Sequence, residues 1–180
     1  MADLYLVRHG QTELNVQNIL QGGHDSPLTA RGREQALATR AAFEVRGIFF
    51  DHAYSSPLGR ARYTAELIVG ENLPIEPVDD LREWRLGSLE GTSNRDMPPQ
   101  PWGDYPVAFG GESEGELRAR MVGALSRIMA RSQHDRVLVV SHGSACQVFL
   151  EYVTGEGELP DTGAVLHFGY CDGAFSLLDW

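Results

Sequence analysis

The stretch LYLVRHG, residues 4–10, decides how the rest of the chain can be interpreted. Its four apolar residues and its polar, glycine-containing end are typical of a buried strand that runs into a loop. The stretch VLVVSHG, residues 137–143, repeats the pattern, and each stretch ends in a His-Gly pair that starts at His9 or His142. Ligands of parallel α/β sheets bind beyond the carboxyl ends of the strands. If the two strands are neighbours, both imidazoles lie in one crevice.

Helical patterns follow the first strand. Thr29 can cap a helix that runs to the mid-forties, with Leu37 and Ala41 spaced four residues apart. Residues 53–55 predict a brief strand, and residues 57–58, Pro-Leu, open a second helix. The apolar face of this second helix is expected to contain Leu58, Ala61, Ala65 and Ile68.

Ser113 and Glu116 form a capping box, which predicts the start of a third helix. Its apolar positions are Leu117, Met121, Ala124, Leu125 and Ile128. A fourth helix is expected after residues 137–143, with apolar positions at Val148, Phe149 and Tyr152. Residues 165–180 alternate around a Cys-Asp-Gly turn, which predicts a hairpin.

Strands that alternate with helices predict an α/β fold. We expect a three-layer sandwich with a mostly parallel central sheet flanked by helices, and a C-terminal hairpin at the sheet edge. With 180 residues, 42% of them apolar, the chain suits a single domain spanning residues 1–180. Residues 87–111 interrupt the pattern with four prolines and three aromatic residues. Long irregular segments are often lids, so we expect a lid-like insertion there.

Charge and composition argue against several classes of protein. The formal net charge is −10, whereas nucleic acids and anionic membranes recruit basic surfaces, so we expect neither as a partner. No stretch approaches the roughly 20 apolar residues of a membrane span, and the N-terminus does not have the pattern of a secretory signal. The two cysteines, Cys146 and Cys171, make no disulfide framework, which favours a reducing, cytoplasmic location.

Two alternatives compete with an anion site at the paired histidines. Each histidine alone could be a structural residue, although two at equivalent strand ends are harder to explain in that way. A metal site is the other alternative, but the permanent charge of Arg8 beside His9 would repel a cation. Arg60 adds a second guanidinium near the start of a helix, where free amides also favour an anion. The residues therefore favour an oxyanion, and we expect no metal.

In combination, the motifs resemble those of the histidine phosphatase superfamily, also called the phosphoglycerate mutase-like family. The match runs nearly end to end, and the motifs occur in the family's order. They are LVRHGQTELN at 6–15, QG at 21–22 with DSPLT at 25–29, SSPLGRA at 55–61 with TAE at 64–66, LRE at 81–83 with Gly87 and EG at 90–91, GES at 111–113, and VSHG at 140–143.

The resemblance implies a phosphohistidine mechanism that needs no cofactor. It assigns His9 as the nucleophile and places Arg8, Arg60 and His142 around the equatorial phosphoryl oxygens. Two guanidiniums, together with a protonated His142, could neutralise the charge that metals neutralise elsewhere. Glu83 matches the family's general acid, which protonates the leaving group and then activates water. Competing carboxylates nearby are Asp79, Asp80 and Glu90.

The loop after the nucleophile is expected to add substrate-binding donors. The resemblance assigns this role to Asn15, Gln21 and Gly22. The second ring nitrogen of His9 is expected to donate to a backbone carbonyl, which would fix the tautomer of the ring.

Three functions are weighed at this point. A cofactor-dependent phosphoglycerate mutase must hold a second phosphate, but residues 87–111 offer only Arg95 as a cation. A catalytically idle scaffold usually loses a catalytic residue, and all five positions are retained here. We therefore expect a phosphomonoester hydrolase that acts on a small phosphorylated metabolite, with Trp102 and Tyr105 either contacting the substrate or filling the core. The terminal hairpin could pair edge to edge in a homodimer.

Overall fold

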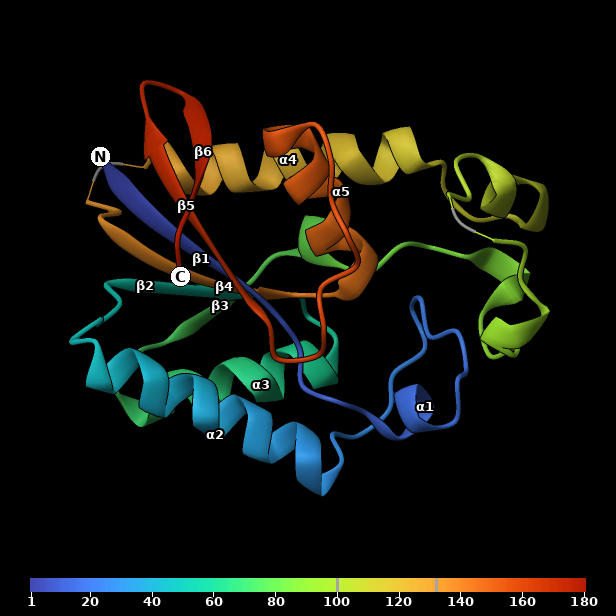
Figure 1. Ribbon diagram of the computed structural model, residues 1–180, viewed down its shortest axis with the longest axis horizontal. Coiled ribbons are helices and arrows are strands. Elements are labelled where there is room, and N and C mark those ends of the chain that lie inside the picture. Colours follow the sequence, from blue (N-terminus) through green and yellow to red (C-terminus); the bar gives the residue numbers. More distant parts are fainter. Residues whose placement is uncertain (100, 132) are drawn as a thin grey trace.

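One sheet of six strands forms the centre of the molecule, in the order β3-β2-β4-β1-β5-β6 (Figure 1). The computed structural model describes residues 1–99, 101–131 and 133–180. Strands from β3 to β1 pair in parallel, and β5 and β6 add an antiparallel edge. The predicted α/β class and the C-terminal hairpin at the sheet edge are confirmed. The strands are β1 (Ala2–Arg8), β2 (His52–Ser55), β3 (Ile75–Pro77), β4 (Arg136–Ser141), β5 (Val165–Cys171) and β6 (Ala174–Leu178).

Helices cover both faces of this sheet, which gives the three layers that were predicted. In Figure 1, α2 and α3 lie on one face, and α4 and α5 lie on the other. The α-helices of the described residues are α1 (Glu13–Val16), α2 (Ala30–Val45), α3 (Gly59–Val69), α4 (Glu114–Met129) and α5 (Gly143–Thr154). Short 3-10 turns occupy Gly70–Asn72, Asp79–Leu81, Gly87–Leu89, Asn94–Asp96 and Tyr105–Phe109. None of the helices described is long and apolar enough to cross a membrane.

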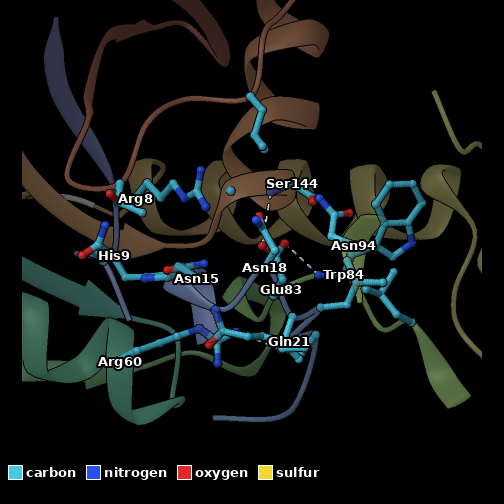
Figure 2. A pocket seen from close by; sticks show the side chains of 18 of the residues that line it. Arg8, His9, Asn15, Asn18, Gln21, Arg60, Glu83, Trp84, Asn94 and Ser144 are labelled. Carbon is cyan, nitrogen blue, oxygen red and sulfur yellow. Dashed lines mark hydrogen bonds between the residues drawn. The ribbon is translucent and has the colours of Figure 1, made fainter. Parts of the chain in front are cut away.

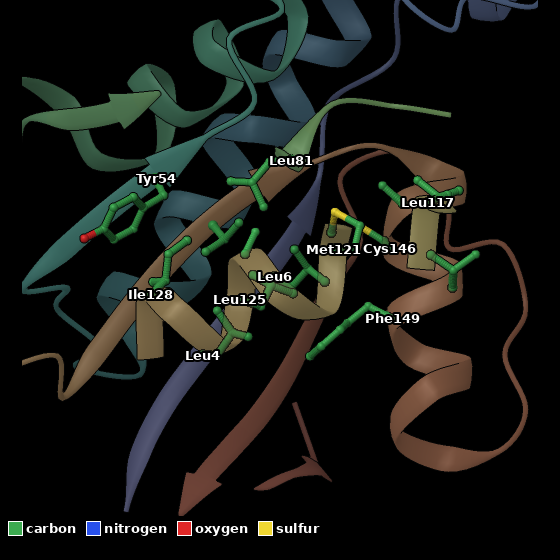
Figure 3. Close-up of a cluster of buried hydrophobic side chains, with 14 of the residues drawn as sticks. Leu4, Leu6, Tyr54, Leu81, Leu117, Met121, Leu125, Ile128, Cys146 and Phe149 are labelled. Carbon is green, nitrogen blue, oxygen red and sulfur yellow. The ribbon is translucent and has the colours of Figure 1, made fainter. Parts of the chain in front are cut away.

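Two apolar clusters hold the layers together because side chains of a strand alternate between its faces. Leu4 and Leu6 of β1 pack with α4 and α5 in the cluster of Figure 3. Tyr5 and Val7 of the same strand pack on the opposite face, against α2 and α3. Full burial of one such aliphatic side chain contributes about 1.5–3 kcal/mol, so β1 is strongly fixed between the layers.

The pairing of β1 with β4 sets the position of the site. In the parallel register, Arg8 at the end of β1 lies opposite Ser141 at the end of β4. His9 and His142 are the next residues of the two strands, so both leave the sheet at the same height and the same edge. The prediction that these two apolar stretches are neighbouring strands is therefore correct.

Some local predictions were wrong. The helix predicted from Thr29 is α2, but Leu37 and Ala41, whose spacing indicated it, are exposed, and its buried face consists of Gly32, Ala36, Thr39 and Phe43. Tyr152 of α5 is also exposed, whereas Val148 and Phe149 are buried as predicted. α3 begins at Gly59, immediately after its N-cap Leu58, rather than at residues 57–58. The strand β3 and the short helix α1 were not predicted.

Candidate active site

His9 and His142 meet at the carboxyl edge of the sheet. Their ring centroids are 5.2 Å apart at an interplanar angle of 64°. His9 follows β1, and His142 is the N-cap residue of α5. His9 is 2% exposed and His142 is fully buried. The two imidazoles are therefore neighbours, as predicted, although His9 lines the cleft of this edge and His142 does not.

The ring of His9 is held by its own neighbour. Nδ1 lies 2.8 Å from the carbonyl oxygen of Gly10, so Nδ1 carries the proton and donates it. The N–H of Gly10 donates in turn to the hydroxyl of Thr64, which donates to the carbonyl of Arg60. A side chain at position 10 would clash with the backbone of Gly32, where a Cβ would lie 2.3 Å from the carbonyl oxygen. Glycine is required here because two backbone segments touch.

Both histidines are held in the neutral form. Burial, followed by the positive charges of Arg60 and Arg8, lowers the pKa of His9 well below its usual 6.5. Burial, again followed by Arg60, lowers the pKa of His142 in the same direction. The lowered pKa favours a neutral His142 in the free site, and protonation of this ring beside a bound phosphoryl group stays a prediction. Neither ring nitrogen of His142 has a hydrogen-bond partner among the described residues.

Two guanidiniums flank the histidines and are held from behind by carbonyl oxygens. Arg60 has a fully buried side chain, and it donates to the carbonyls of Gly22 and His24 at 2.9 and 2.7 Å. Arg8 donates to the carbonyl of Pro160 at 2.6 Å. The Nε atoms of both arginines are buried and have no partner in the described part of the chain. These contacts fix the orientation of both guanidinium groups.

The start of α3 does not offer the anion site that was expected of it. The carboxylate of Asp25 accepts hydrogen bonds from the backbone N–H groups of Gly59 and Arg60. It also accepts one from the Arg60 guanidinium at 3.1 Å. The first N–H groups of α3 therefore bond to Asp25 rather than to a bound anion, and the same carboxylate holds Arg60 in place.

Glu83 is fixed at the start of α5. Its carboxylate accepts backbone hydrogen bonds from Trp84 at 2.9 Å, Ser144 at 3.3 Å and Ala145 at 3.2 Å. It lies in the same cleft as His9. The three other carboxylates considered for this role, Asp79, Asp80 and Glu90, are not among the residues that line the cleft. Asp79 is exposed and pairs with Arg82.

An arginine of α4 holds the segment that carries Glu83. Arg120 donates to the backbone carbonyls of Asp80, Arg82 and Glu83 at 2.8, 2.6 and 2.8 Å. It also pairs with the buried carboxylate of Glu112. Burial raises the pKa of Glu112, but its hydrogen bonds from Arg120 and Arg85 outweigh this and lower the pKa. Glu112 and Arg120 thus form a charged clamp under the segment.

A cleft of about 300 Å³ connects these groups. All predicted site residues line it except His142, which is fully buried beside His9. In Figure 2, Arg8, His9, Asn15 and Arg60 lie at one end, and Glu83 lies between them and Trp84. The lining also contains residues that sequence reasoning did not single out, namely Gln11, Asn18, Ile19, Leu20, Leu86, Asn94, Ser144, Leu159 and Thr162.

The three predicted donors of the loop differ in what they have to offer. Asn15 uses its Oδ1 atom to accept hydrogen bonds from Thr12, which leaves its amide N–H₂ without a partner among the described residues. The side chain of Gln21 is bonded to Thr12 and Ser26, so it braces the loop. The N–H of Gly22 has no partner within the described chain, and the residue lines the cleft with φ at +51°.

The irregular segment at 87–111 reaches the cleft through two side chains. Trp102 lines the cleft and also packs against the core, so its packing role is confirmed and its contact with a substrate stays a prediction. Tyr105 is exposed and packs on Phe109, away from the lining. Asn94 is the other lining residue of the segment, while its neighbour Arg95 is exposed outside the cleft.

Comparison with known proteins gives the family. The family model described as histidine phosphatase superfamily (branch 1) matches residues 4–178. The chain belongs to this superfamily. A mechanism in which a phosphoryl group passes through a histidine is general to this superfamily.

Relatives within the superfamily carry both phosphatase and mutase names. The chain is 33% identical to a broad-specificity phosphatase of Saccharomyces cerevisiae, with 85% of this chain and 70% of that protein covered. It is 39% identical to a probable phosphoglycerate mutase of Proteus mirabilis, with 86% and 76% covered. Among solved structures, phosphoglycerate mutase from Bacillus anthracis superposes with a TM-score of 0.88 at 27% identity, with 99% and 92% covered.

Proposed function

We propose that this protein hydrolyses a small phosphorylated metabolite through a phosphohistidine at His9. The observation that supports this best is the hydrogen bond from Nδ1 of His9 to the carbonyl of Gly10. It leaves the lone pair on Nε2, and His9 lines the cleft between Arg8 and Arg60. A neutral imidazole in that position is a nucleophile aimed at a bound phosphoryl group.

In the first step, Nε2 of His9 attacks phosphorus and the P–O bond of the ester breaks. Arg8 and Arg60 bind the equatorial oxygens and neutralise their charge. His142 donates a third hydrogen bond to the phosphoryl group, because a bound dianion favours protonation of this ring. The amide N–H₂ of Asn15 and the N–H of Gly22 add neutral donors. Glu83 gives its proton to the departing alkoxide.

In the second step, the roles of Glu83 are reversed. Its carboxylate takes a proton from water, the water oxygen bonds to phosphorus, and the N–P bond to His9 breaks. Inorganic phosphate and neutral His9 result, so the cycle closes with no net change in the protein. The protein's own cations supply the charge neutralisation, and we propose that no metal or other cofactor takes part.

The role of Glu83 is tested by varying the leaving group. Glu83→Gln should lower kcat/KM far more for an alkyl phosphate than for p-nitrophenyl phosphate, because the nitrophenolate leaves without a proton. The matched control is Asp79→Asn, which alters an exposed carboxylate outside the cleft. It should leave kcat/KM unchanged for both esters. Equal losses for both esters in Glu83→Gln would contradict the assignment.

A phosphoglycerate mutase is the second candidate, because relatives with that name match the chain. A mutase must bind a second phosphate in its site. Among the described residues that line the cleft, Arg8 and Arg60 are the cations, and both lie at the phosphoryl end. This favours hydrolysis. An assay of 3-phosphoglycerate with and without 2,3-bisphosphoglycerate separates the two, since isomerised product that depends on the bisphosphate would establish the mutase.

The finer expectations about the whole chain are also proposals. We propose a single domain over residues 1–180, with 87–111 as a lid-like insertion beside the cleft, and a cytoplasmic location. The homodimer is proposed through β6, which is the edge strand of the sheet and carries the half-exposed Leu177. Light scattering on the purified protein tests the dimer, and a monomer at micromolar concentration would exclude it.

A further inference from the structure

We propose that the outer half of the cleft binds a neutral, hydroxyl-bearing leaving group, such as a polyol or sugar, through the carboxamides of Asn18 and Asn94. This inference rests on the proposed phosphatase function and names its substrate class. It starts from the distribution of charge along the cleft.

Charge in the cleft is confined to one end and its middle. Arg8 and Arg60 lie at the phosphoryl end, and Glu83 follows them (Figure 2). Beyond Glu83, the described lining residues carry no charge. A second phosphate or a carboxylate on the leaving group would meet no cation among the described lining residues there. The leaving group that fits this end is therefore neutral.

Asn18 and Asn94 are held together by the backbone. The N–H of Asn94 donates to the carbonyl of Asn18 at 2.8 Å, and Ile19 and Ser93 form an antiparallel bridge beside them. Leu20 continues this pairing with a hydrogen bond to the carbonyl of Thr92 at 2.9 Å. The loop after the nucleophile and the 87–111 segment thus form one rim, and the two asparagines are adjacent on it.

Asn18 and Asn94 are exposed and line the cleft, and neither carboxamide is hydrogen-bonded to another described residue. Each carboxamide has two donors and an accepting oxygen. A hydroxyl group also donates and accepts, so neighbouring hydroxyls of a polyol can satisfy both side chains. A carboxylate can only accept and would leave the amide oxygens unpaired.

The aromatic wall fits the same class of ligand. The ring centroids of Trp84 and Trp102 are 6.0 Å apart. Their N–H groups are bonded to the backbone carbonyls of Glu112 and Pro98, and both residues line the cleft, Trp84 as a buried residue and Trp102 as a half-buried one. Apolar ring surface packs against the C–H groups of a sugar or polyol, while the asparagines take its hydroxyls.

The test compares esters that differ only in the leaving group, namely glycerol 3-phosphate, propyl phosphate and 3-phosphoglycerate. We expect kcat/KM for glycerol 3-phosphate to exceed both others by about tenfold or more, as one well-placed hydrogen bond allows. Asn94→Ala and Asn18→Gly should remove most of the preference over propyl phosphate. Glycine is chosen at position 18 because φ is +57° there, which glycine adopts without strain.

Arg95→Ala is the matched control, because Arg95 belongs to the same turn as Asn94 but lies outside the cleft. It should leave the preference unchanged. Equal or better turnover of 3-phosphoglycerate, or equal losses for all three esters in the asparagine variants, would overturn the inference. If the enzyme hydrolyses p-nitrophenyl phosphate but shows no preference for glycerol 3-phosphate among the three esters, this inference is refuted and the proposed phosphatase function is not. Absence of turnover of any ester would refute the proposed function itself.

Discussion

Nδ1 of His9 lies 2.8 Å from the carbonyl oxygen of Gly10, and this contact decides which nitrogen of the ring faces the cleft. Because burial and the two arginines lower the pKa of His9, the ring should stay neutral as the pH falls through 6.5. Nitrogen NMR of the free enzyme should show the Nδ1–H tautomer and no protonation at pH 6. A ring that titrates near 6.5, or that carries its proton on Nε2, would contradict the account.

Stability should fall in mild acid. The unfolded chain protonates its histidines near pH 6.5, while native His9 and His142 have lowered pKa values and remain neutral. Below 6.5 the unfolded state therefore binds more protons, and each such histidine reduces the free energy of unfolding by up to about 1.4 kcal/mol per pH unit. This loss continues until the pH reaches the native pKa.

Urea unfolding in buffer without phosphate, between pH 7.5 and 5, measures this effect. His142→Asn removes one of the two titrating rings and should flatten the dependence relative to the wild type. Asparagine is suited to the position because His142 is an N-cap residue. An identical slope in the variant and the wild type would show that the native ring of His142 is not held neutral.

The clamp beneath Glu83 should matter for catalysis more than for substrate binding. Arg120→Lys replaces a fork that bonds three carbonyls with a single ammonium, so Glu83 should lose its exact position. We expect kcat to fall on the order of 10- to 100-fold, with a smaller change in KM because Arg8 and Arg60 are untouched. The loss should be larger for alkyl phosphates than for p-nitrophenyl phosphate.

Arg127→Lys is the control for this clamp, because Arg127 reaches the same segment through an exposed ion pair with Asp80. It should have little effect on kcat. If Arg120→Lys raised KM and left kcat unchanged, the clamp would have no role in holding the general acid.

Asp25 should affect the binding of phosphate and phosphoesters, because it holds Arg60. Asp25→Asn removes the charge that faces a buried guanidinium and weakens the cap on α3, which should cost about 1 kcal/mol of stability. Burial lowers the pKa of Arg60, and the negative charges of Glu83 and Asp25 partly offset this effect. Removing the Asp25 charge therefore leaves the buried guanidinium less well balanced. We expect a higher KM for phosphoesters and a higher inhibition constant for inorganic phosphate.

Glu66→Gln is the comparison for Asp25→Asn. Glu66 pairs with Arg62 on the exposed side of the same helix, and removal of such a pair changes stability by about 0.5 kcal/mol or less. An unchanged phosphate affinity in Asp25→Asn would mean that Arg60 is held by the carbonyls alone.

The sequence predicts best the features that depend on neighbouring residues. The two apolar stretches that end at His9 and His142 are buried strands because their burial is encoded locally. The capping box at Ser113 is present for the same reason. The buried face of α2 is hard to predict because it contains Gly32 and Ala36, which give little apolar signal. β3 was missed because its three residues are a strand only through pairing with β2.

The supports of the site were harder to predict because each joins distant residues. Asp25 meets Arg60 across 35 positions, and Arg120 meets the Glu83 carbonyl across 37. Asp25 lay in a recognised motif, but nothing in the motif said that its carboxylate would occupy the helix start. The lowered pKa of His142 depends on its burial beside His9, which only the folded chain reveals.

The central claim is a covalent phosphoryl group on His9, and rapid quenching tests it most directly. The enzyme is mixed with a ³²P-labelled phosphomonoester in the presence of EDTA and stopped within one turnover. We expect protein-bound label that is acid-labile and base-stable, that maps to His9, and that is absent from folded His9→Ala protein. Label on a serine or cysteine, or full activity of His9→Ala, would contradict it.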